Sequence, residues 1–258
     1  MQLFCGRYYV QGSPYCSILA GMTTSFAELG LNEHILAGVE ALGFDTPTPV
    51  QAGAIPAVLA GRDVLASAQT GTGKTCAFTL PALQRIAEAN PADAEGTRRP
   101  KGQAGPFALV ITPTRELASQ IEDVAQEVCA VTGQRTVVVM GGARFEPQVK
   151  AIKQGCDLLV ATPGRLIDLM ERKVVSLAHV EVLVLDEADR MLDMGFWPSV
   201  RQIVRATPDS RQTLLFSATI PPSIKPTVDA MLTDPAVIEI ARVGETAATV
   251  DEHLCPVV

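Results

Sequence analysis

Short apolar runs rich in β-branched residues recur along the chain, and segments with helical periodicity separate them. Runs of this length with few charges are typical of strands buried on both faces. Strands that alternate with helices along a chain form parallel sheets with helices on both faces. The pattern therefore predicts an α/β fold with three layers around a mostly parallel central sheet. The predicted strands lie at residues 62–68, 107–114, 135–140, 156–163, 180–187, 212–219 and 236–240.

A polar, glycine-rich or charged segment follows each of these strands except the last. In open parallel sheets, ligands bind outside the carboxyl ends of the strands. We therefore expect the functional groups of this protein at one edge of the sheet. In chain order the segments are "QTGTGKT", "PTREL", "GG", "TPGR", "DEAD" and "SAT".

The segment "ASAQTGTGKT", residues 66–75, has the pattern of a phosphate-binding loop between a strand and a helix. Its glycines let backbone N–H groups wrap a phosphate, Lys74 reaches the β- and γ-phosphates, and Thr75 offers a hydroxyl to Mg²⁺. The first position is Ala68, where the strict pattern has glycine, and several P-loop families permit this departure. The alternative is a glycine-rich turn that only caps a helix, and the flanking strand and helix favour phosphate binding.

In the segment "VEVLVLDEADRML", residues 180–192, a mostly apolar run is followed by three carboxylates within four positions, Asp186, Glu187 and Asp189. Mg²⁺ prefers oxygen ligands and is usually held by one or two carboxylates together with substrate phosphates. Asp186 therefore fits a magnesium anchor beside the P-loop, and Glu187 fits a group that orients or deprotonates the attacking water. The alternative is that the acids cap the following helix, and for Asp189 alone this alternative is equally good.

Composition limits the classes of function. A chain of 258 residues can form one large domain or two small ones. Its net charge of −7 argues against binding nucleic acid by bulk electrostatics, so any polyanion must meet a local basic site. The six cysteines form no C-x-x-C pair, which predicts neither a zinc site nor a disulfide framework.

The two ends and one internal segment differ from the α/β pattern. Residues 1–22 are predicted to be an N-terminal extension of unassigned role, because "MTTSFAELG" from Met22 resembles a natural start. Residues 90–106, rich in Pro, Gly and charge, predict an exposed loop. No apolar run approaches the roughly 20 residues that cross a bilayer, and no signal-peptide core is visible, so we expect a cytoplasmic protein without a membrane partner.

Together these motifs resemble those of a known family. Their order and spacing, with "GFDTPTPVQ" at residues 43–51 as a Q motif, are similar to the first RecA-like domain of the DEAD-box ATP-dependent RNA helicases. The sequence "LDEADRMLDMGF", residues 185–196, is most similar to that of bacterial RhlE-like members. The resemblance covers about residues 24–242 and implies a RecA-like P-loop NTPase domain at 23–242.

The resemblance implies ATP and Mg²⁺ as cofactors. Gln51 would read the adenine edge, and Phe26 would pack on the base. The implied P-loop contacts to the nucleotide are Ala68, Gln69, Thr70, Gly71, Thr72, Gly73, Lys74 and Thr75.

The catalytic groups implied by the resemblance are Lys74, Asp186 and Glu187. Asp186 would bind Mg²⁺ through water, Thr75 would complete the metal site, and Glu187 would activate the hydrolytic water. A further set would couple the nucleotide site to RNA handling through bonds from Asp189 to the "SAT" segment. The coupling residues are Asp189, Ser217, Ala218 and Thr219.

The remaining segments resemble the RNA-contacting motifs of the family. They offer small residues for close backbone approach, helix N-termini and two arginines for phosphates, but no arrangement that reads bases. RNA binding should therefore be directed at the backbone and independent of sequence. The implied RNA-binding residues are Pro113, Thr114, Arg115, Gly141, Gly142, Thr162, Pro163, Gly164 and Arg165.

In this family an arginine finger and half of the RNA surface come from a second RecA-like domain, and no "HRxGRxxR" string occurs in this sequence. We therefore expect residues 243–258 to begin a linker to a second RecA-like domain that this monomeric chain lacks, with weak ATP binding and little turnover. One alternative is a truncated, non-catalytic RNA- or partner-binding fragment. Another P-loop enzyme, such as a DNA translocase, is disfavoured by the Q motif.

Overall fold

A computed structural model describes residues 25–91 and 105–240 of the chain. The predicted extension at residues 1–22, the linker at 243–258 and most of the loop at 90–106 lie outside the described residues. Among the described cysteines, Cys76, Cys129 and Cys156 are buried, as expected of small apolar side chains.

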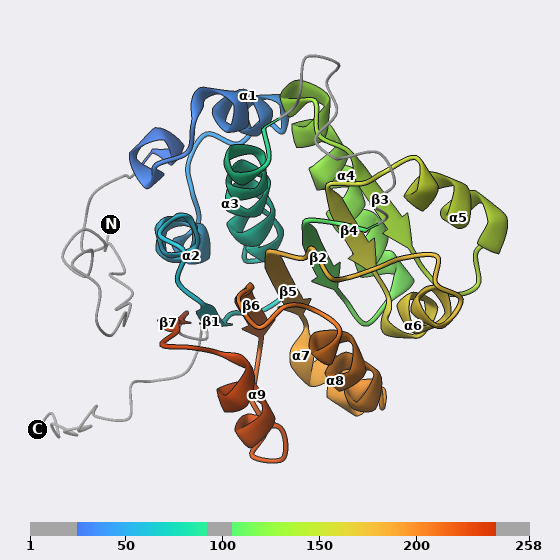
Figure 1. The fold of residues 1–258 in the computed structure, drawn as a ribbon. Helices are drawn as coiled ribbons and strands as arrows, with labels where there is room; N and C mark the ends of the chain where they lie inside the picture. The colour runs from blue at the N-terminus through green and yellow to red at the C-terminus, as the bar shows by residue number, and fades with distance from the viewer. Residues whose placement is uncertain (1–24, 92–104, 241–258) are drawn as a thin grey trace, which may run out of the picture.

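The described strands form one sheet in the order β3-β4-β2-β5-β6-β1-β7 (Figure 1). Every neighbouring pair in this sheet is parallel. The predicted α/β fold is therefore confirmed, and each predicted apolar run contains one strand. The strands are β1 (Val64–Ser67), β2 (Ala108–Ile111), β3 (Thr136–Val139), β4 (Leu158–Ala161), β5 (Val182–Asp186), β6 (Gln212–Ser217) and β7 (Ala236–Glu239).

Successive side chains along the strands enter two separate hydrophobic cores, one on each face of the sheet. In β5, Val182 and Val184 pack in the first core, whereas Leu183 and Leu185 pack in the second. This division follows from the two-residue period of a strand. Because helices cover both faces, the strands read as continuous apolar runs and not as an alternation of apolar and polar residues.

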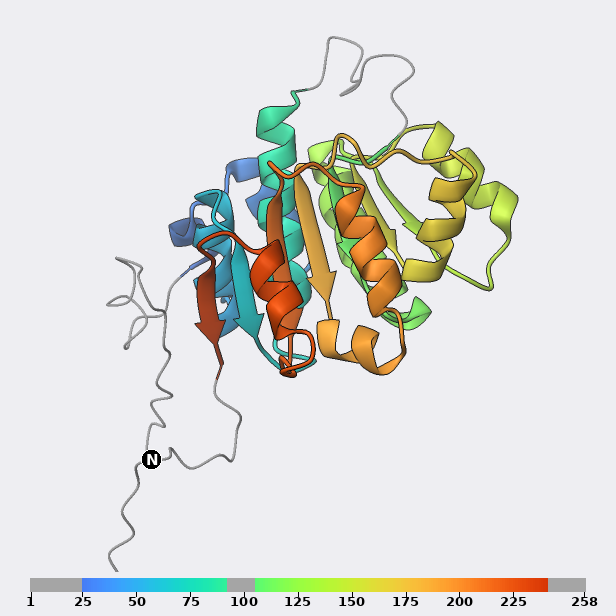
Figure 2. The ribbon, with the colours of Figure 1, turned by 60° about the horizontal axis from the view of Figure 1, so that its bottom comes forward.

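Helices on the two faces complete the three predicted layers (Figure 2). No helix of the described residues is long and apolar enough to span a bilayer. The first core is covered by the 3-10 helix η2 (Phe26–Leu29), α1 (Glu33–Ala41), α2 (Pro49–Leu59), α3 (Lys74–Ala89) and α4 (Arg115–Thr132). The second is covered by α5 (Phe145–Lys153), α6 (Pro163–Glu171), α7 (Ala188–Asp193), α8 (Trp197–Arg205) and α9 (Lys225–Met231).

The strand order divides the carboxyl edge of the sheet into two halves. The neighbours β5, β6 and β1 end in "DEAD", "SAT" and the P-loop, and the neighbours β3, β4 and β2 end in "GG", "TPGR" and "PTREL". The chain reaches this order because β5 and β6 insert between β1 and β2. Parallel strands deliver all six segments to one edge, as the sequence predicts.

Candidate functional site

The P-loop between β1 and α3 requires glycine at its last turn. Gly73 is the N-cap of α3 with φ 90°, in the left-handed region. A Cβ at this position would lie 2.6 Å from the Gln51 Nε2 atom and 2.9 Å from the Thr48 Oγ1 atom. Both the backbone conformation and the close approach of α2 therefore exclude a side chain here.

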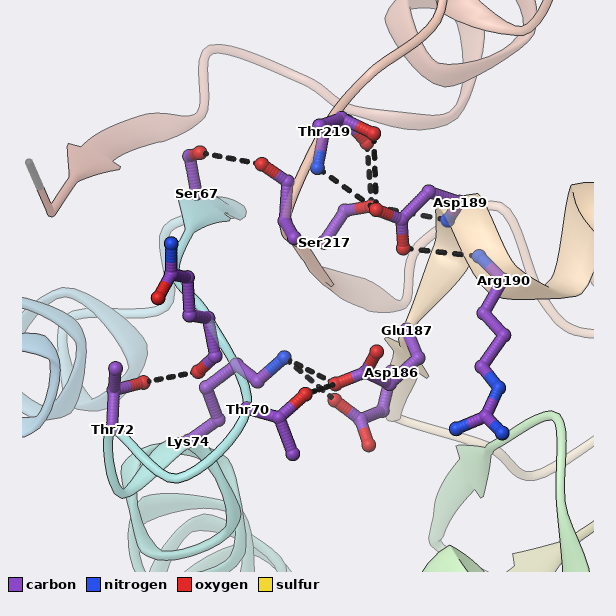
Figure 3. A network of polar contacts seen from close by, with 12 residues as sticks. Ser67, Thr70, Thr72, Lys74, Asp186, Glu187, Asp189, Arg190, Ser217 and Thr219 are labelled. Atoms are coloured by element: carbon purple, nitrogen blue, oxygen red, sulfur yellow. Dashed lines mark hydrogen bonds and ion pairs between the residues drawn. The ribbon is translucent and has the colours of Figure 1, made fainter. Parts of the chain in front are cut away.

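Lys74 extends from the first residue of α3 toward the end of β5, as Figure 3 shows. Its Nζ atom donates to Glu187 Oε1 at 2.6 Å and lies 4.0 Å from Asp186 Oδ1. The Thr70 hydroxyl donates to the same Glu187 oxygen at 3.0 Å. The structure thus brings together the three residues expected to be catalytic, with Lys74 bound to Glu187.

Asp186 is the most enclosed acid of the site, with 4% of the residue exposed. Burial raises the pKa of its carboxyl from 3.8 to about 7, while Lys74 opposes the shift and Glu187 adds to it. Its Oδ1 atom has no hydrogen-bond partner among the described residues. A buried carboxylate oxygen without a donor suits a divalent cation that arrives with the phosphates, so the residue fits the magnesium role.

Glu187 has a strained backbone. It adopts φ 55° and ψ 51° as the N-cap of α7, a left-handed conformation that is uncommon for residues with a Cβ. Such strain is found at functional sites, where the surrounding structure holds it in place. Here the conformation turns the chain sharply at the end of β5, and the Glu187 side chain meets Lys74.

Asp189 bonds to the "SAT" segment at the end of β6. Its backbone N–H donates to Ser217 Oγ at 3.0 Å, and its Oδ2 accepts from the Thr219 backbone and hydroxyl at 2.9 and 3.0 Å. The Ala218 carbonyl accepts from the hydroxyl of Ser67, at the end of β1, at 3.3 Å. The "SAT" segment therefore contacts both the strand before the P-loop and the "DEAD" helix.

Gln51 lies in α2 and has both ends of its amide engaged. Its Oε1 accepts from the Thr48 N–H at 2.8 Å, and its Nε2 donates to the Gly73 carbonyl at 3.0 Å. The Thr48 bond is part of a capping box, a pattern readable in "TPVQ" that the sequence reasoning missed. Reading an adenine edge would require Gln51 to exchange these bonds, and that role stays a prediction.

Phe26 lies in η2 and packs in the first hydrophobic core with 4% of the residue exposed. Packing on a base would require its ring to become accessible, so this role also stays a prediction. In the P-loop itself, Gln69 and Thr70 are exposed, Thr75 is half-buried, and the Thr72 hydroxyl donates to the Gln69 carbonyl at 2.7 Å. The Ala68 N–H donates to the Ser217 carbonyl at 3.1 Å, which fixes the start of the loop to β6.

The predicted RNA-contacting segments meet in one groove of about 470 Å³ at the other half of the edge. The Thr162 hydroxyl accepts from the Gly141 N–H at 3.3 Å, and Arg165 Nη2 donates to the Ala143 carbonyl at 3.2 Å. A Cβ on Gly142, which has φ 76°, would lie 2.7 Å from Arg115 Nη1. The groove is lined by Pro113, Arg115, Gly141, Gly142, Thr162, Gly164, Arg165, Asp168 and Phe196.

Of the predicted RNA-binding residues, Thr114 and Pro163 do not line this groove. Thr114 caps α4 by accepting from the Leu117 N–H, and Pro163 is the buried first residue of α6. Sequence reasoning missed Gln148, whose amide bonds to both the N–H and the carbonyl of Met140 and so fixes the turn before Gly141. Sequence reasoning also missed Phe145, whose ring lies against Arg165 of this groove, because an isolated aromatic residue gives no motif signal.

Comparison with known proteins agrees with this geometry. Residues 48–227 match the DEAD/DEAH box helicase family. The chain is 45% identical over 228 residues to "DEAD-box ATP-dependent RNA helicase 52A" of Oryza sativa subsp. japonica, an alignment that covers 86% of this chain and 38% of the rice protein. It is 42% identical over 233 residues to "RNA helicase CrhR" of Synechocystis sp., covering 90% and 44%. The chain spans less than half the length of these curated relatives, and it belongs to the DEAD/DEAH box helicase family.

Proposed function

We propose that this chain is the ATP-binding RecA-like domain of an ATP-dependent RNA helicase. The observation that carries the proposal is the contact of Lys74 with Glu187 beside Asp186, because it joins the P-loop to the "DEAD" strand. The relatives named above are RNA helicases by their names, which supports the same assignment. Because the acids and the lysine are all present in one site, the non-catalytic alternative is not favoured.

In the proposed reaction Lys74 exchanges its bond to Glu187 for phosphate oxygens of ATP. This exchange frees the Glu187 carboxylate to accept a proton from the attacking water or to orient it. Thr75 and Asp186 would hold Mg²⁺, which would supply neutralisation of the phosphate charge. Phe26 and Gln51 would contact the base, and the bonds of Asp189 to Ser217 and Thr219 would relay the state of the nucleotide site to the RNA groove.

The RNA part of the proposal depends on the groove at β3, β4 and β2. It has two arginines, Arg115 and Arg165, among glycines that permit close approach, which fits phosphates better than base edges. Binding is therefore independent of sequence. A second RecA-like domain as partner, a monomeric state and a cytoplasmic location remain predictions from the sequence.

The experiment is a fluorescence titration of the 258-residue chain with an ATP analogue, with and without Mg²⁺. Lys74→Ala should weaken binding by about tenfold or more, because it removes the cation of the phosphate site. Asp186→Asn should abolish the gain in affinity from Mg²⁺. Lys225→Ala is the matched control, because Lys225 is exposed and its ion pair within the described part of the chain is with Asp229 on α9. Equal affinities of wild type and Lys74→Ala would refute the proposed nucleotide site.

Glu187→Gln separates binding from catalysis. The substitution keeps the size of the side chain and one acceptor oxygen, but it replaces the other oxygen by an NH2 donor and so removes the base. Single-turnover hydrolysis should fall by about 10²-fold or more, while the affinity for the ATP analogue changes little. An unchanged rate would remove Glu187 from the proposed role.

A further inference from the structure

Phe145, the first residue of α5, contacts two arginines of the neighbouring helix. The guanidinium carbon of Arg172 lies 4.7 Å from the centre of the Phe145 ring, and that of Arg165 lies 5.5 Å from it. Arg165 is in α6 and Arg172 is its C-cap, seven residues later, which places both on the same face of the helix. These separations are typical of cation–π interactions.

Neither arginine is paired with an acid among the described residues. No carboxylate of the described residues lies within 4.0 Å of either guanidinium. Arg165 donates one bond from Nη2 to the Ala143 carbonyl, and its Nε and Nη1 atoms are buried without a partner among the described residues, so a phosphate would reach them only after a small shift of the groove. An aromatic face and a carbonyl fix the direction of a guanidinium without neutralising it, whereas a carboxylate would do both.

We propose that Phe145 is a positioning residue that orients Arg165 and Arg172 toward the phosphates of RNA. Arg165 lines the groove formed by the "PTREL", "GG" and "TPGR" segments. Arg172 lies seven residues further along α6, beyond the last of these motifs and beyond Asp168, an acid that also lines the groove but forms no ion pair with either arginine. This inference rests on the proposed RNA-binding function and adds to it one aromatic residue and one phosphate contact.

Phe145 also packs on the second hydrophobic core, so the test must separate packing from orientation of the arginines. Phe145→Leu keeps an apolar side chain at this position but removes the aromatic face. Phe145→Tyr keeps both. If Phe145 only filled space, the two variants would not differ in how they affect RNA binding or its salt dependence.

The first experiment measures binding of a labelled single-stranded oligonucleotide of uridine to the 258-residue chain by fluorescence anisotropy at several salt concentrations. Phe145→Leu should weaken binding by about three- to tenfold, whereas Phe145→Tyr should bind with the affinity of the wild type. Arg172→Gln should lower the slope of log affinity against log salt concentration by about 0.7, the value for one phosphate contact with a single strand. Arg201→Gln is the matched control, an exposed arginine of α8 outside the groove.

Wild-type affinity and salt slope in Phe145→Leu would overturn the inference and leave the proposed function intact. Failure of the wild-type chain to bind the oligonucleotide at low salt would overturn the RNA-binding function, and the inference with it. A second measurement needs no RNA. In nuclear magnetic resonance spectra of the free chain, the side-chain signals of Arg165 and Arg172 should carry a ring-current shift that disappears in Phe145→Leu. Unchanged signals would contradict the positioning role directly.

Discussion

Glu187 combines a strained backbone with the chemistry expected of the site. A residue with a Cβ in the left-handed region costs roughly 1–2 kcal/mol, and Glu187 lies in that region with φ 55°. At this residue, then, folding stability and function are in opposition. The ion pair between Glu187 and Lys74 offsets part of this free-energy cost in the structure described.

A pair of substitutions at this position isolates the strain. Glu187→Ala and Glu187→Gly both remove the carboxylate, but only glycine accepts a positive φ without cost. We expect Glu187→Gly to be more stable than Glu187→Ala by about 1 kcal/mol in urea denaturation, with neither variant able to hydrolyse ATP. Equal stabilities of the two variants would mean that the left-handed turn carries no strain.

One variant can separate the structural role of Gln51 from its predicted base-reading role. Its amide ties Thr48 to Gly73, so Gln51→Ala should lower the free energy of unfolding by about 1–2 kcal/mol through the lost hydrogen bonds. If the predicted base-reading role is also correct, the variant should lose more affinity for ATP than for GTP. Thr48→Ala perturbs the same capping box without touching a base, and it should weaken both nucleotides equally. Equal losses in Gln51→Ala would leave Gln51 with the structural role alone.

The strands were predictable as elements from periodicity, but most contacts between elements were not, and the expected bonds from Asp189 to "SAT" came from the family resemblance. Runs such as residues 180–187 stand out because burial on both faces removes polar residues from the strand, and this is a local property. Lys74 and Glu187 are 113 residues apart, and Gln51 and Gly73 are 22 apart. Such pairs are set by how the elements pack in three dimensions, which periodicity does not encode. The family resemblance supplied the expected roles, but it gave no signal for the tie from Gln51 to the P-loop or for the contacts of Phe145.

Asp63 holds three elements together at the amino edge of the sheet, opposite the candidate site. Directly before β1, its Oδ1 accepts from the Thr213 N–H of β6 at 2.8 Å, and its Oδ2 accepts from the Thr233 N–H near β7 at 2.7 Å. Asp63→Ala would leave both donors without this acceptor, so we expect a loss of about 2–4 kcal/mol in urea denaturation. The affinity of the folded protein for ATP should not change.

The control for this prediction is Asp229→Ala, which breaks an exposed ion pair on α9 and should change stability by less than about 0.5 kcal/mol. A similar effect of both substitutions would show that Asp63 does not hold these elements together.

At the scale of the whole molecule, the described sheet places the segments predicted to bind the nucleotide and those predicted to bind RNA on adjacent halves of one edge. β6 lies between β5 and β1, so "SAT" can bond to the "DEAD" helix and to the end of β1 at once. The boundary between the halves falls between β5 and β2, which are hydrogen-bonded neighbours. A conformational change that passes from the predicted nucleotide site to the predicted RNA groove would therefore cross only adjacent strands, although the segments themselves are far apart in the sequence.

The rate of ATP hydrolysis depends on all the groups around the nucleotide and not on a single residue. Among the described residues, Lys74 is the cation paired with Asp186 and Glu187, the two acids expected to be catalytic. In related phosphoryl-transfer sites an arginine finger contributes about 10³–10⁵ in rate. We therefore expect the 258-residue chain to bind ATP and Mg²⁺ but to hydrolyse ATP slowly, with little stimulation by RNA.

Phosphate release under multiple-turnover conditions measures this rate of hydrolysis, and Glu187→Gln gives the background rate. Adding a separate polypeptide that carries a second RecA-like domain of a DEAD-box relative should raise the rate of the wild-type chain but not that of Glu187→Gln. Strong RNA-stimulated hydrolysis by the 258-residue chain alone would show that it needs no arginine from another domain.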